Sequence, residues 1–303
     1  MTVPVIDISG DPRKVAAEVG AACSELGFLT VIGHGVPDDV VERTASAAES
    51  FFDLPEGEKR LLTEGEPTLG LPAYRPLRSE SLAASLGRKA PGDLKESLDW
   101  GPAVAGFGWP ERPPELRNAY EEYFATLSAL GGRLRGLFAR ALALPEDWFE
   151  DAFRGHVSSM RAVNYPQLDG EVEPGQLRAG AHTDYGCMTI LHGDDAPGGL
   201  QVQARDDRWL DVHPVPGSFV VNLGDMMARW TNDRWPATLH RVAVPAADLA
   251  AASRRQTIVF FHDPRADAVI ECIPSCADPA HPPQYEPVTA LQHIQSKAAK
   301  AFA

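Results

Sequence analysis

Cysteine is scarce in this chain of 303 residues, which contains four: Cys23, Cys187, Cys272 and Cys276. Four cysteines are too few for a disulfide framework in a chain of this length, so a disulfide-stabilised secreted scaffold is excluded. Cys272 and Cys276 lie near His281, which makes a zinc site an alternative there, but free thiols are the preferred interpretation. We therefore expect a cytoplasmic protein with reduced cysteines.

Basic residues are also in deficit, since Lys and Arg number 28 against 42 Asp and Glu, for a net charge of −14. Nucleic acids and anionic membrane surfaces bind basic patches, so we expect neither as a partner. No apolar run is long enough to cross a bilayer, and the first residues lack the basic and apolar segments of a signal peptide. A small-molecule substrate is not excluded, because a local arginine cluster can override the net charge.

Residues 1–110 have the pattern of an N-terminal α/β portion. A strand is expected at 3–8 and a buried strand at 28–32, each followed by apolar residues at helical spacing. The longest helical stretch covers 113–144, where apolar residues form a stripe along one face. Residues 286–303 have helical composition and predict a C-terminal helix.

From residue 158 onward the pattern changes to short β-rich runs separated by turns. Such runs predict a sandwich or barrel, and with a metal inside the expected form is a double-stranded β-helix, or jelly roll, over 155–265. The chain shows no repeat and no clear linker, so we predict one compact domain over 1–303, mainly β with flanking helices. The expected strands are 160–164, 182–192, 199–203, 209–211, 218–223, 240–244 and 256–261.

The candidate metal ligands are His182, Asp184 and His240. Residues i and i+2 of a strand point to the same face, so His182 and Asp184 could reach one ion. His240 lies 56 residues beyond Asp184, so only a sheet that folds back can add it. Two imidazoles and one carboxylate on one face of a metal are typical of ferrous iron in oxygen chemistry. His192 is a rival ligand, but it precedes a turn and is expected at the strand end.

Arg255 and Thr257 form an Arg-x-Thr pattern at the start of the last expected strand. An arginine fork with a neighbouring hydroxyl suits a carboxylate held by two hydrogen bonds. Together with the candidate ligands, this pattern resembles the non-haem Fe(II), 2-oxoglutarate-dependent oxygenases of the isopenicillin N synthase type. The signature of that family is His-x-Asp, a distal His, and Arg-x-Ser before an aromatic pair.

The resemblance implies Fe(II) and 2-oxoglutarate as cofactors, with the iron on the three candidate ligands. It implies that Arg255 binds the far carboxylate of 2-oxoglutarate and that Thr257 replaces the usual Ser while keeping the hydroxyl. Tyr165 resembles a family tyrosine, followed by proline, that also reaches the cosubstrate. The resemblance continues near the N-terminus, in residues 27–36, and covers nearly the whole chain.

The resemblance also implies an enzyme that oxidises a small molecule with O2 and releases succinate and CO2. Hydroxylation is the default outcome, with desaturation or ring chemistry as other outcomes. Arg255 lies 15 residues beyond His240, which resembles the spacing in bacterial ring-expanding antibiotic enzymes and points to specialised metabolism such as antibiotic biosynthesis. Two alternatives are an iron oxidase that needs no 2-oxoglutarate and a non-catalytic metal-binding jelly roll. The sequence determines neither the substrate nor the oligomeric state.

Tyr74, Arg75 and Arg78 are candidate substrate contacts. They lie in a segment rich in Pro, Gly, Ser and Arg, at 67–92, where the related enzymes place substrate-contacting residues. The alternative is a solvated loop with ordinary surface arginines. Arg161, in the first expected core strand, either binds a substrate carboxylate or pairs structurally, and the sequence favours neither.

Overall fold

The computed structural model describes residues 2–63, 73–101, 109–168, 172–194, 196, 199–246, 249 and 253–301. The first elements are β1 (Val5–Asp7), α1 (Pro12–Glu25), β2 (Phe28–Ile32), α2 (Asp38–Phe52), α3 (Glu56–Arg60), η1 (Leu61–Thr63), β3 (Tyr74–Arg75), η2 (Leu82–Leu86), β4 (Glu96–Trp100), α4 (Leu116–Ala141) and α5 (Glu150–Phe153). They are followed by β5 (Ser159–Tyr165), β6 (Ala179–His182), β7 (Met188–Gly193), β8 (Leu200–Gln203), β9 (Trp209–Asp211), β10 (Phe219–Leu223), α6 (Asp225–Trp230), β11 (His240–Val242), β12 (Arg255–His262), β13 (Val269–Ile270), η4 (Pro274–Cys276), β14 (Val288–Thr289) and α7 (Ala290–Ala301). Short strands thus dominate from β5 onward, as the sequence predicts.

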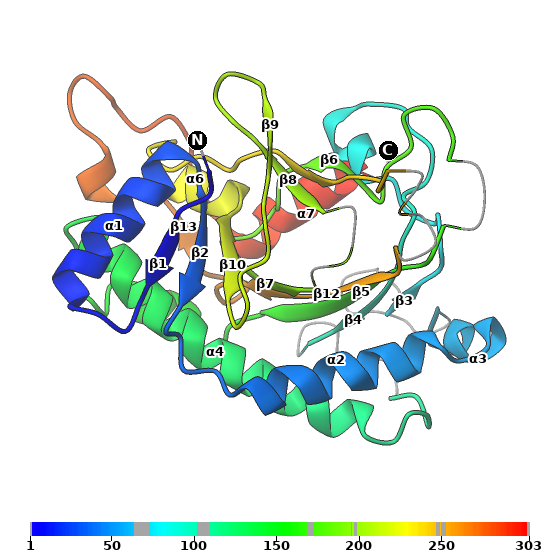
Figure 1. Ribbon diagram of the computed structural model, residues 1–303. Coiled ribbons are helices and arrows are strands. Elements are labelled where there is room, and N and C mark those ends of the chain that lie inside the picture. The colour runs from blue at the N-terminus through cyan, green and yellow to red at the C-terminus, as the bar shows by residue number, and fades with distance from the viewer. Residues whose placement is uncertain are drawn as a thin grey trace.

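Two sheets form the core of the fold (Figure 1). The larger has eight strands in the order β1-β2-β10-β7-β12-β5-β4-β3, and the smaller has four in the order β6-β11-β8-β9. Apolar side chains of the two sheets meet in shared clusters, such as Leu200 with Val220 and Val163 with Val242. This double-sheet arrangement confirms the predicted jelly-roll core.

The N-terminal strands extend the larger sheet. β2 pairs antiparallel with β10, and β1 adds to β2 in parallel. Between them, α1 starts after Asp11, whose carboxylate accepts hydrogen bonds from the backbone N of Arg13 and Lys14 and so caps the helix. Hydrogen bonds within one sheet therefore join the predicted α/β portion to the core. The limits of the α/β portion at 1–110, of the jelly roll at 155–265 and of the single domain at 1–303 stay predictions.

Side chains of β12 alternate between two environments. Ile258 and Phe260 belong to the large apolar cluster that contains the helices, whereas Val259 belongs to a cluster between the two sheets. Because strand side chains alternate with a period of two, Arg255 and Thr257 share the face of Val259. The strand therefore directs its polar residues into the space between the sheets.

Helices α2 and α4 pack against each other and lie beneath the larger sheet (Figure 1). The apolar stripe predicted over 113–144 is the buried face of α4, which includes Leu116, Tyr120, Tyr123, Leu127, Leu130 and Leu134. The helices thus close the outer face of the sheet and leave its inner face for the site. Among the described residues, no helix is both long and apolar enough to cross a membrane.

Three local predictions differ from the structure. The expected strand at 182–192 is two strands, β6 and β7, separated by a loop at 183–187. The C-terminal helix begins at Ala290 and not at residue 286, because β14 pairs with β13 just before it. Strand β4 and helix α6 were not predicted. Part of the predicted 67–92 loop lies outside the described residues.

Candidate active site

Three side chains, His182, Asp184 and His240, converge between the two sheets. One ligand atom from each lies within 4.8 Å of the others. The Nε2 atoms of His182 and His240 are 3.8 and 3.7 Å from Asp184 Oδ1. Antiparallel pairing of β6 with β11 makes His182 and His240 direct partners, which explains how residues far apart in the sequence come together.

The geometric reason offered for the His-x-Asp pair was wrong. β6 ends at His182, so Asp184 lies in the loop and not on the same strand face. The start of α6 binds the backbone of this loop and so turns the Asp184 carboxylate back toward the histidines. The backbone N of Asp225 donates to the carbonyl O of Asp184 at 2.8 Å, and that of Met226 donates to the carbonyl O of Gly186 at 3.0 Å. A Cβ on Gly224 would lie 2.3 Å from Gly186 O, so this close approach requires glycine.

Hydrogen bonds orient each ligand with one atom left for a metal. His182 Nδ1 lies 2.8 Å from Gly180 O and His240 Nδ1 lies 3.1 Å from Thr238 O, so each ring donates its Nδ1 proton and presents a bare Nε2. Asp184 Oδ2 accepts from Thr189 Oγ1 at 2.5 Å and from Asn222 Nδ2 at 2.7 Å. These partners leave Oδ1 of Asp184 directed at both histidines.

The protonation states of the cluster suit a divalent cation. Burial and the neighbouring His240 lower the pKa of His182 well below its ordinary value, which keeps the imidazole neutral. Burial acts to raise the pKa of Asp184, but the two histidines and the hydrogen bonds from Thr189 and Asn222 outweigh it and the pKa is lowered. Neutral imidazoles and an ionised carboxylate are the forms that bind metal, and this set of two N and one O donors fits Fe(II).

Arg255, Thr257 and Tyr165 lie together on two paired strands, with Arg255 directly opposite Tyr165. Within the described part of the chain, Arg255 Nε and Thr257 Oγ1 are buried and have no hydrogen-bond partner. Burial raises the pKa of Tyr165, and the charge of Arg255 acts in the opposite direction. Buried polar atoms without partners are costly, so a buried cation beside a buried hydroxyl fits an anionic ligand such as a carboxylate.

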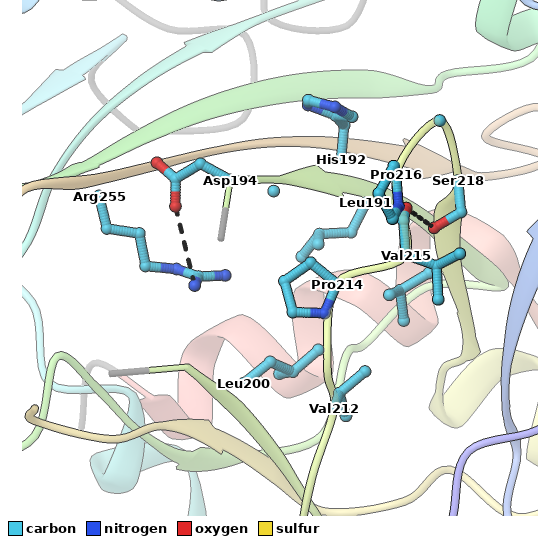
Figure 2. A pocket seen from close by; sticks show the side chains of 13 residues that line it. Leu191, His192, Asp194, Leu200, Val212, Pro214, Val215, Pro216, Ser218 and Arg255 are labelled. Carbon is cyan, nitrogen blue, oxygen red and sulfur yellow. Dashed lines mark hydrogen bonds and ion pairs between the residues drawn. The ribbon is translucent and has the colours of Figure 1, made fainter. Parts of the chain in front are cut away.

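The guanidinium of Arg255 points into a cavity of about 300 Å³ (Figure 2). Leu191, Leu200 and Val220 form apolar walls, and Asp194 Oδ1 lies 3.8 Å from Arg255 NH1 at the rim. A Cβ on Gly193 would lie 3.1 Å from Arg255 NH2, so glycine provides room for the guanidinium. The cavity thus presents the guanidinium of Arg255 among mainly apolar side chains, with the carboxylate of Asp194 beside it, and the three metal-ligand candidates are not part of its lining. The guanidinium suits the terminal carboxylate of a short ligand.

The predicted substrate contacts lie in different environments. Arg161 and Arg75 both reach Asp99: Arg161 Nε lies 2.5 Å from Oδ1, and Arg75 NH2 lies 3.3 Å from Oδ2. Tyr74 is completely buried in the apolar cluster, with its hydroxyl 2.5 Å from Glu96 Oε2. This placement corrects the prediction for Tyr74, because a core side chain cannot also face a substrate.

Arg78 is exposed and has a positive φ of 62°. The structure does not bring it to the metal cluster. A Cβ on Gly92 would lie 2.3 Å from Arg78 O, so the turn at Arg78 packs tightly against Gly92. Of the four predicted contacts, Arg161 and Arg75 are therefore the two that share one charged cluster, centred on Asp99.

The remaining histidines and cysteines form no second metal cluster within the described residues. His192 is near the end of β7, as expected, and lines the cavity of Figure 2 instead of joining the triad. None of the four cysteines forms a disulfide, and the interpretation of Cys272 and Cys276 as free thiols stays a prediction. The sequence reasoning missed Thr189 and Asn222, for which the only signal is that each sits within a predicted strand.

Two family profiles match the chain. Residues 157–264 match the 2OG-Fe(II) oxygenase superfamily, and residues 3–121 match a family described as non-haem dioxygenase in morphine synthesis N-terminal. The chain is 32% identical over 324 residues to the 2-oxoglutarate-Fe(II) type oxidoreductase hxnY of Emericella nidulans, a match covering 99% of this chain and 90% of the relative. It is 31% identical over 298 residues to validamycin A dioxygenase of Streptomyces hygroscopicus, covering 91% and 80%.

Solved structures agree with these matches. A full-length Neurospora crassa protein in complex with alpha-KG superposes with a TM-score of 0.87 at 28% identity, covering 98% of this chain and 96% of that one. JOX2 in complex with 2OG, Fe and JA superposes with a TM-score of 0.80 at 29% identity, covering 96% and 83%. The chain therefore belongs to the 2-oxoglutarate- and Fe(II)-dependent oxygenase superfamily.

The family confirms the resemblance drawn from the motifs. The protein is an Fe(II)- and 2-oxoglutarate-dependent dioxygenase that oxidises a small molecule. Its cofactors are Fe(II) and 2-oxoglutarate, and the described residues contain a His-Asp-His cluster able to hold the metal. The alternatives, a 2-oxoglutarate-independent oxidase and a non-catalytic metal-binding protein, are not favoured.

Proposed function

We propose that His182, Asp184 and His240 hold the Fe(II) and that Arg255, with Thr257 and Tyr165, anchors 2-oxoglutarate. One observation carries the iron assignment: each ligand has its other polar atom occupied by a protein hydrogen bond, so one lone pair per residue remains at a common point. The buried and unpartnered atoms of Arg255 and Thr257 support the cosubstrate assignment.

The residues of the chain bind, orient and exclude water, while bound iron supplies the activation of O2 that is coupled to conversion of 2-oxoglutarate into succinate and CO2. Arg255 binds the far carboxylate of 2-oxoglutarate and so sets how far the cosubstrate lies from the three metal ligands. Leu191 and Val259 lie on the inner face of the sheet and make the surface near Arg255 apolar. Thr189 and Asn222 orient the Asp184 carboxylate by hydrogen bonds to its Oδ2.

We infer that the substrate is a compact polar molecule of specialised metabolism that meets Arg161 beside the triad. Related proteins act on chemically diverse small molecules, as the names homoarginine-6-hydroxylase and validamycin A dioxygenase indicate, and the Neurospora crassa protein has also been crystallised with thymine. Arg161 is on the strand that also carries Tyr165, and it is only partly exposed. A cytoplasmic location and the absence of nucleic-acid and membrane partners stay predictions from charge and cysteine content.

Replacement of a proposed ligand tests the iron site. His240→Ala removes one of three ligands, so Fe(II) binding and CO2 release from 2-oxoglutarate labelled at carbon 1 should both be lost while the fold is retained. His213→Ala is the matched control, because His213 is exposed and is not part of the cluster. Stoichiometric iron and wild-type turnover in His240→Ala would show that the assignment is wrong.

A further inference from the structure

A cluster of six charged side chains lies along one side of the proposed iron site. Each exposes 15% or less of its side chain. They come from β3, β4, β5 and the segments that precede η2 and β4. The three basic members are Arg75, Lys95 and Arg161, and the three acidic members are Glu80, Asp93 and Asp99.

Glu80 is the acid on which all three cations converge. Its Oε1 lies 2.5 Å from Arg75 NH1, and its Oε2 lies 2.5 Å from Lys95 Nζ and 3.8 Å from Arg161 NH1. Burial acts to raise the pKa of Glu80, but the charges of Lys95, Arg161 and Arg75 outweigh it and hold the pKa far below its ordinary value. Glu80 is therefore a permanent carboxylate at the centre of the cluster.

Asp99 accepts hydrogen bonds from two of the three guanidinium nitrogens of Arg161. Its Oδ1 lies 2.5 Å from Arg161 Nε and its Oδ2 lies 3.2 Å from Arg161 NH2, which is the two-pronged geometry of a strong pair. The remaining nitrogen, NH1, is 3.8 Å from Glu80, beyond hydrogen-bond distance. NH1 can thus donate to an oxygen of a bound molecule, but the positive charge of Arg161 is already matched.

The cluster borders β6, the strand that ends at His182. Asp93 Oδ1 accepts from the backbone N of Gly180, two residues before the first ligand, at 3.0 Å. Lys95 Nζ lies 3.9 Å from Asp93 Oδ2 and 2.5 Å from Glu80 Oε2, and Glu80 Oε2 is 3.8 Å from Arg161 NH1. These contacts connect Glu80 and Arg161 to the strand that ends at His182.

We propose that Glu80 is a specificity-determining residue that fills the anion position beside the iron site, so that the substrate group received by Arg161 is uncharged and not a carboxylate. A buried carboxylate needs an unmatched cation, and a second carboxylate beside Glu80 meets a like charge instead. An amide or lactam carbonyl accepts one hydrogen bond from NH1 without that cost. The inference rests on the proposed iron site.

Matched probes of equal shape test this inference on the holoenzyme. Benzamide and benzoate are titrated under anaerobic conditions into protein saturated with Fe(II) and 2-oxoglutarate, and the change in the visible absorption of the iron complex reports binding. The proteins are wild type, Glu80→Gln, and Glu58→Gln as a control, because Glu58 is a partly exposed acid that pairs with Arg112 and not with the cluster. Saturating 2-oxoglutarate keeps benzoate off Arg255.

Wild type should bind benzamide more tightly than benzoate. Glu80→Gln should improve benzoate binding by about ten-fold and leave benzamide binding nearly unchanged, whereas Glu58→Gln should match wild type. An unchanged preference in Glu80→Gln, or no benzoate binding by it, overturns the inference. A wild-type preference for benzoate overturns it without any variant, so a folding defect cannot conceal the result. If wild type forms no absorbing complex with Fe(II) and 2-oxoglutarate, the proposed iron site has failed instead.

Discussion

Arg255 combines deep burial with an incomplete set of hydrogen bonds. Its exposed fraction is 5%, its Nε has no partner among the described residues, and its NH1 only approaches Ala196 O at 3.4 Å. A buried cation in this state gains most from a ligand with a carboxylate. The residue that precedes it in the sequence, Arg254, is more exposed and pairs with Asp53 at 2.8 Å on the outer surface.

Arg255→Gln should weaken 2-oxoglutarate binding by roughly thirty-fold or more. Loss of one partner of a buried charge pair costs about 2–5 kcal/mol, and about 1.4 kcal/mol corresponds to ten-fold in affinity. Iron affinity should change little, because Arg255 lies on a different strand from the triad. Anaerobic calorimetry with 2-oxoglutarate measures the effect, and Arg254→Gln serves as the adjacent control. Equal losses in both variants would remove the special role of Arg255.

At the scale of elements, two helices hold the loop that carries Asp184. The start of α6 binds its backbone through the N–H groups of Asp225 and Met226. Helix α7 also reaches this region, with His293 Nε2 3.1 Å from Tyr185 O and Lys297 Nζ 2.6 Å from Asp225 Oδ2 at the start of α6. The C-terminal helix therefore braces the metal loop although it provides no ligand.

His293→Ala should loosen this brace and speed the loss of iron. His293 is 6% exposed, so its hydrogen bond to Tyr185 O is sheltered from water. One such bond contributes about 1 kcal/mol, which predicts an Fe(II) affinity about five-fold lower. Competition with a metal chelator measures the affinity. Gln295→Ala, at an exposed position of the same helix, is the control, and His293→Gln should recover part of the loss. Unaltered iron retention in His293→Ala would mean that α7 is not a brace.

At the scale of the whole molecule, stability depends on the pH through Asp263, a buried acid whose carboxylate contacts the loop that carries Asp184. Asp263 Oδ1 accepts from Cys187 N at 2.6 Å, and a Cβ on Gly186 would lie 2.2 Å from the same oxygen. Burial raises the pKa of Asp263 to about 6, with a smaller contribution from Asp184. The folded state therefore binds a proton more tightly than the unfolded chain, and the contribution of Asp263 to stability falls as the pH rises from about 4 to about 6.

The side chain of Asn cannot ionise, so the Asp263→Asn variant should not lose stability as the pH rises from about 4 to about 6. Relative to wild type, its free energy of unfolding should rise by about 2–3 kcal/mol between pH 4 and pH 7, since one pKa unit corresponds to about 1.4 kcal/mol. Urea unfolding at a series of pH values, with a chelator present to keep both proteins metal-free, measures the difference. Parallel stability curves for the two proteins would contradict the raised pKa.

Features of this protein that depend on short-range pattern can be predicted from its amino-acid order. A period of 3.6 residues predicts the buried face of α4, because the pattern reflects one helix meeting one apolar surface. Short β-rich runs between turns predict the core strands. The motif at His182 and Asp184, with His240 and Arg255 after it, indicated the family before any geometry was known. Chemistry of this kind requires particular side chains, so it is visible in their identity.

Which distant groups lie next to one another follows from the long-range pairing of strands. The register of β6 with β11 makes His182 and His240 neighbours, and the pairing of β4 with β5 places Asp99 opposite Arg161. Tyr74 was predicted at the substrate but lies in the core, because the pleat of β3 turns it toward the helices. Sheet register depends on contacts between segments far apart in the chain, and no local pattern specifies such contacts. The charge balance around Glu80 follows from the same long-range pairing.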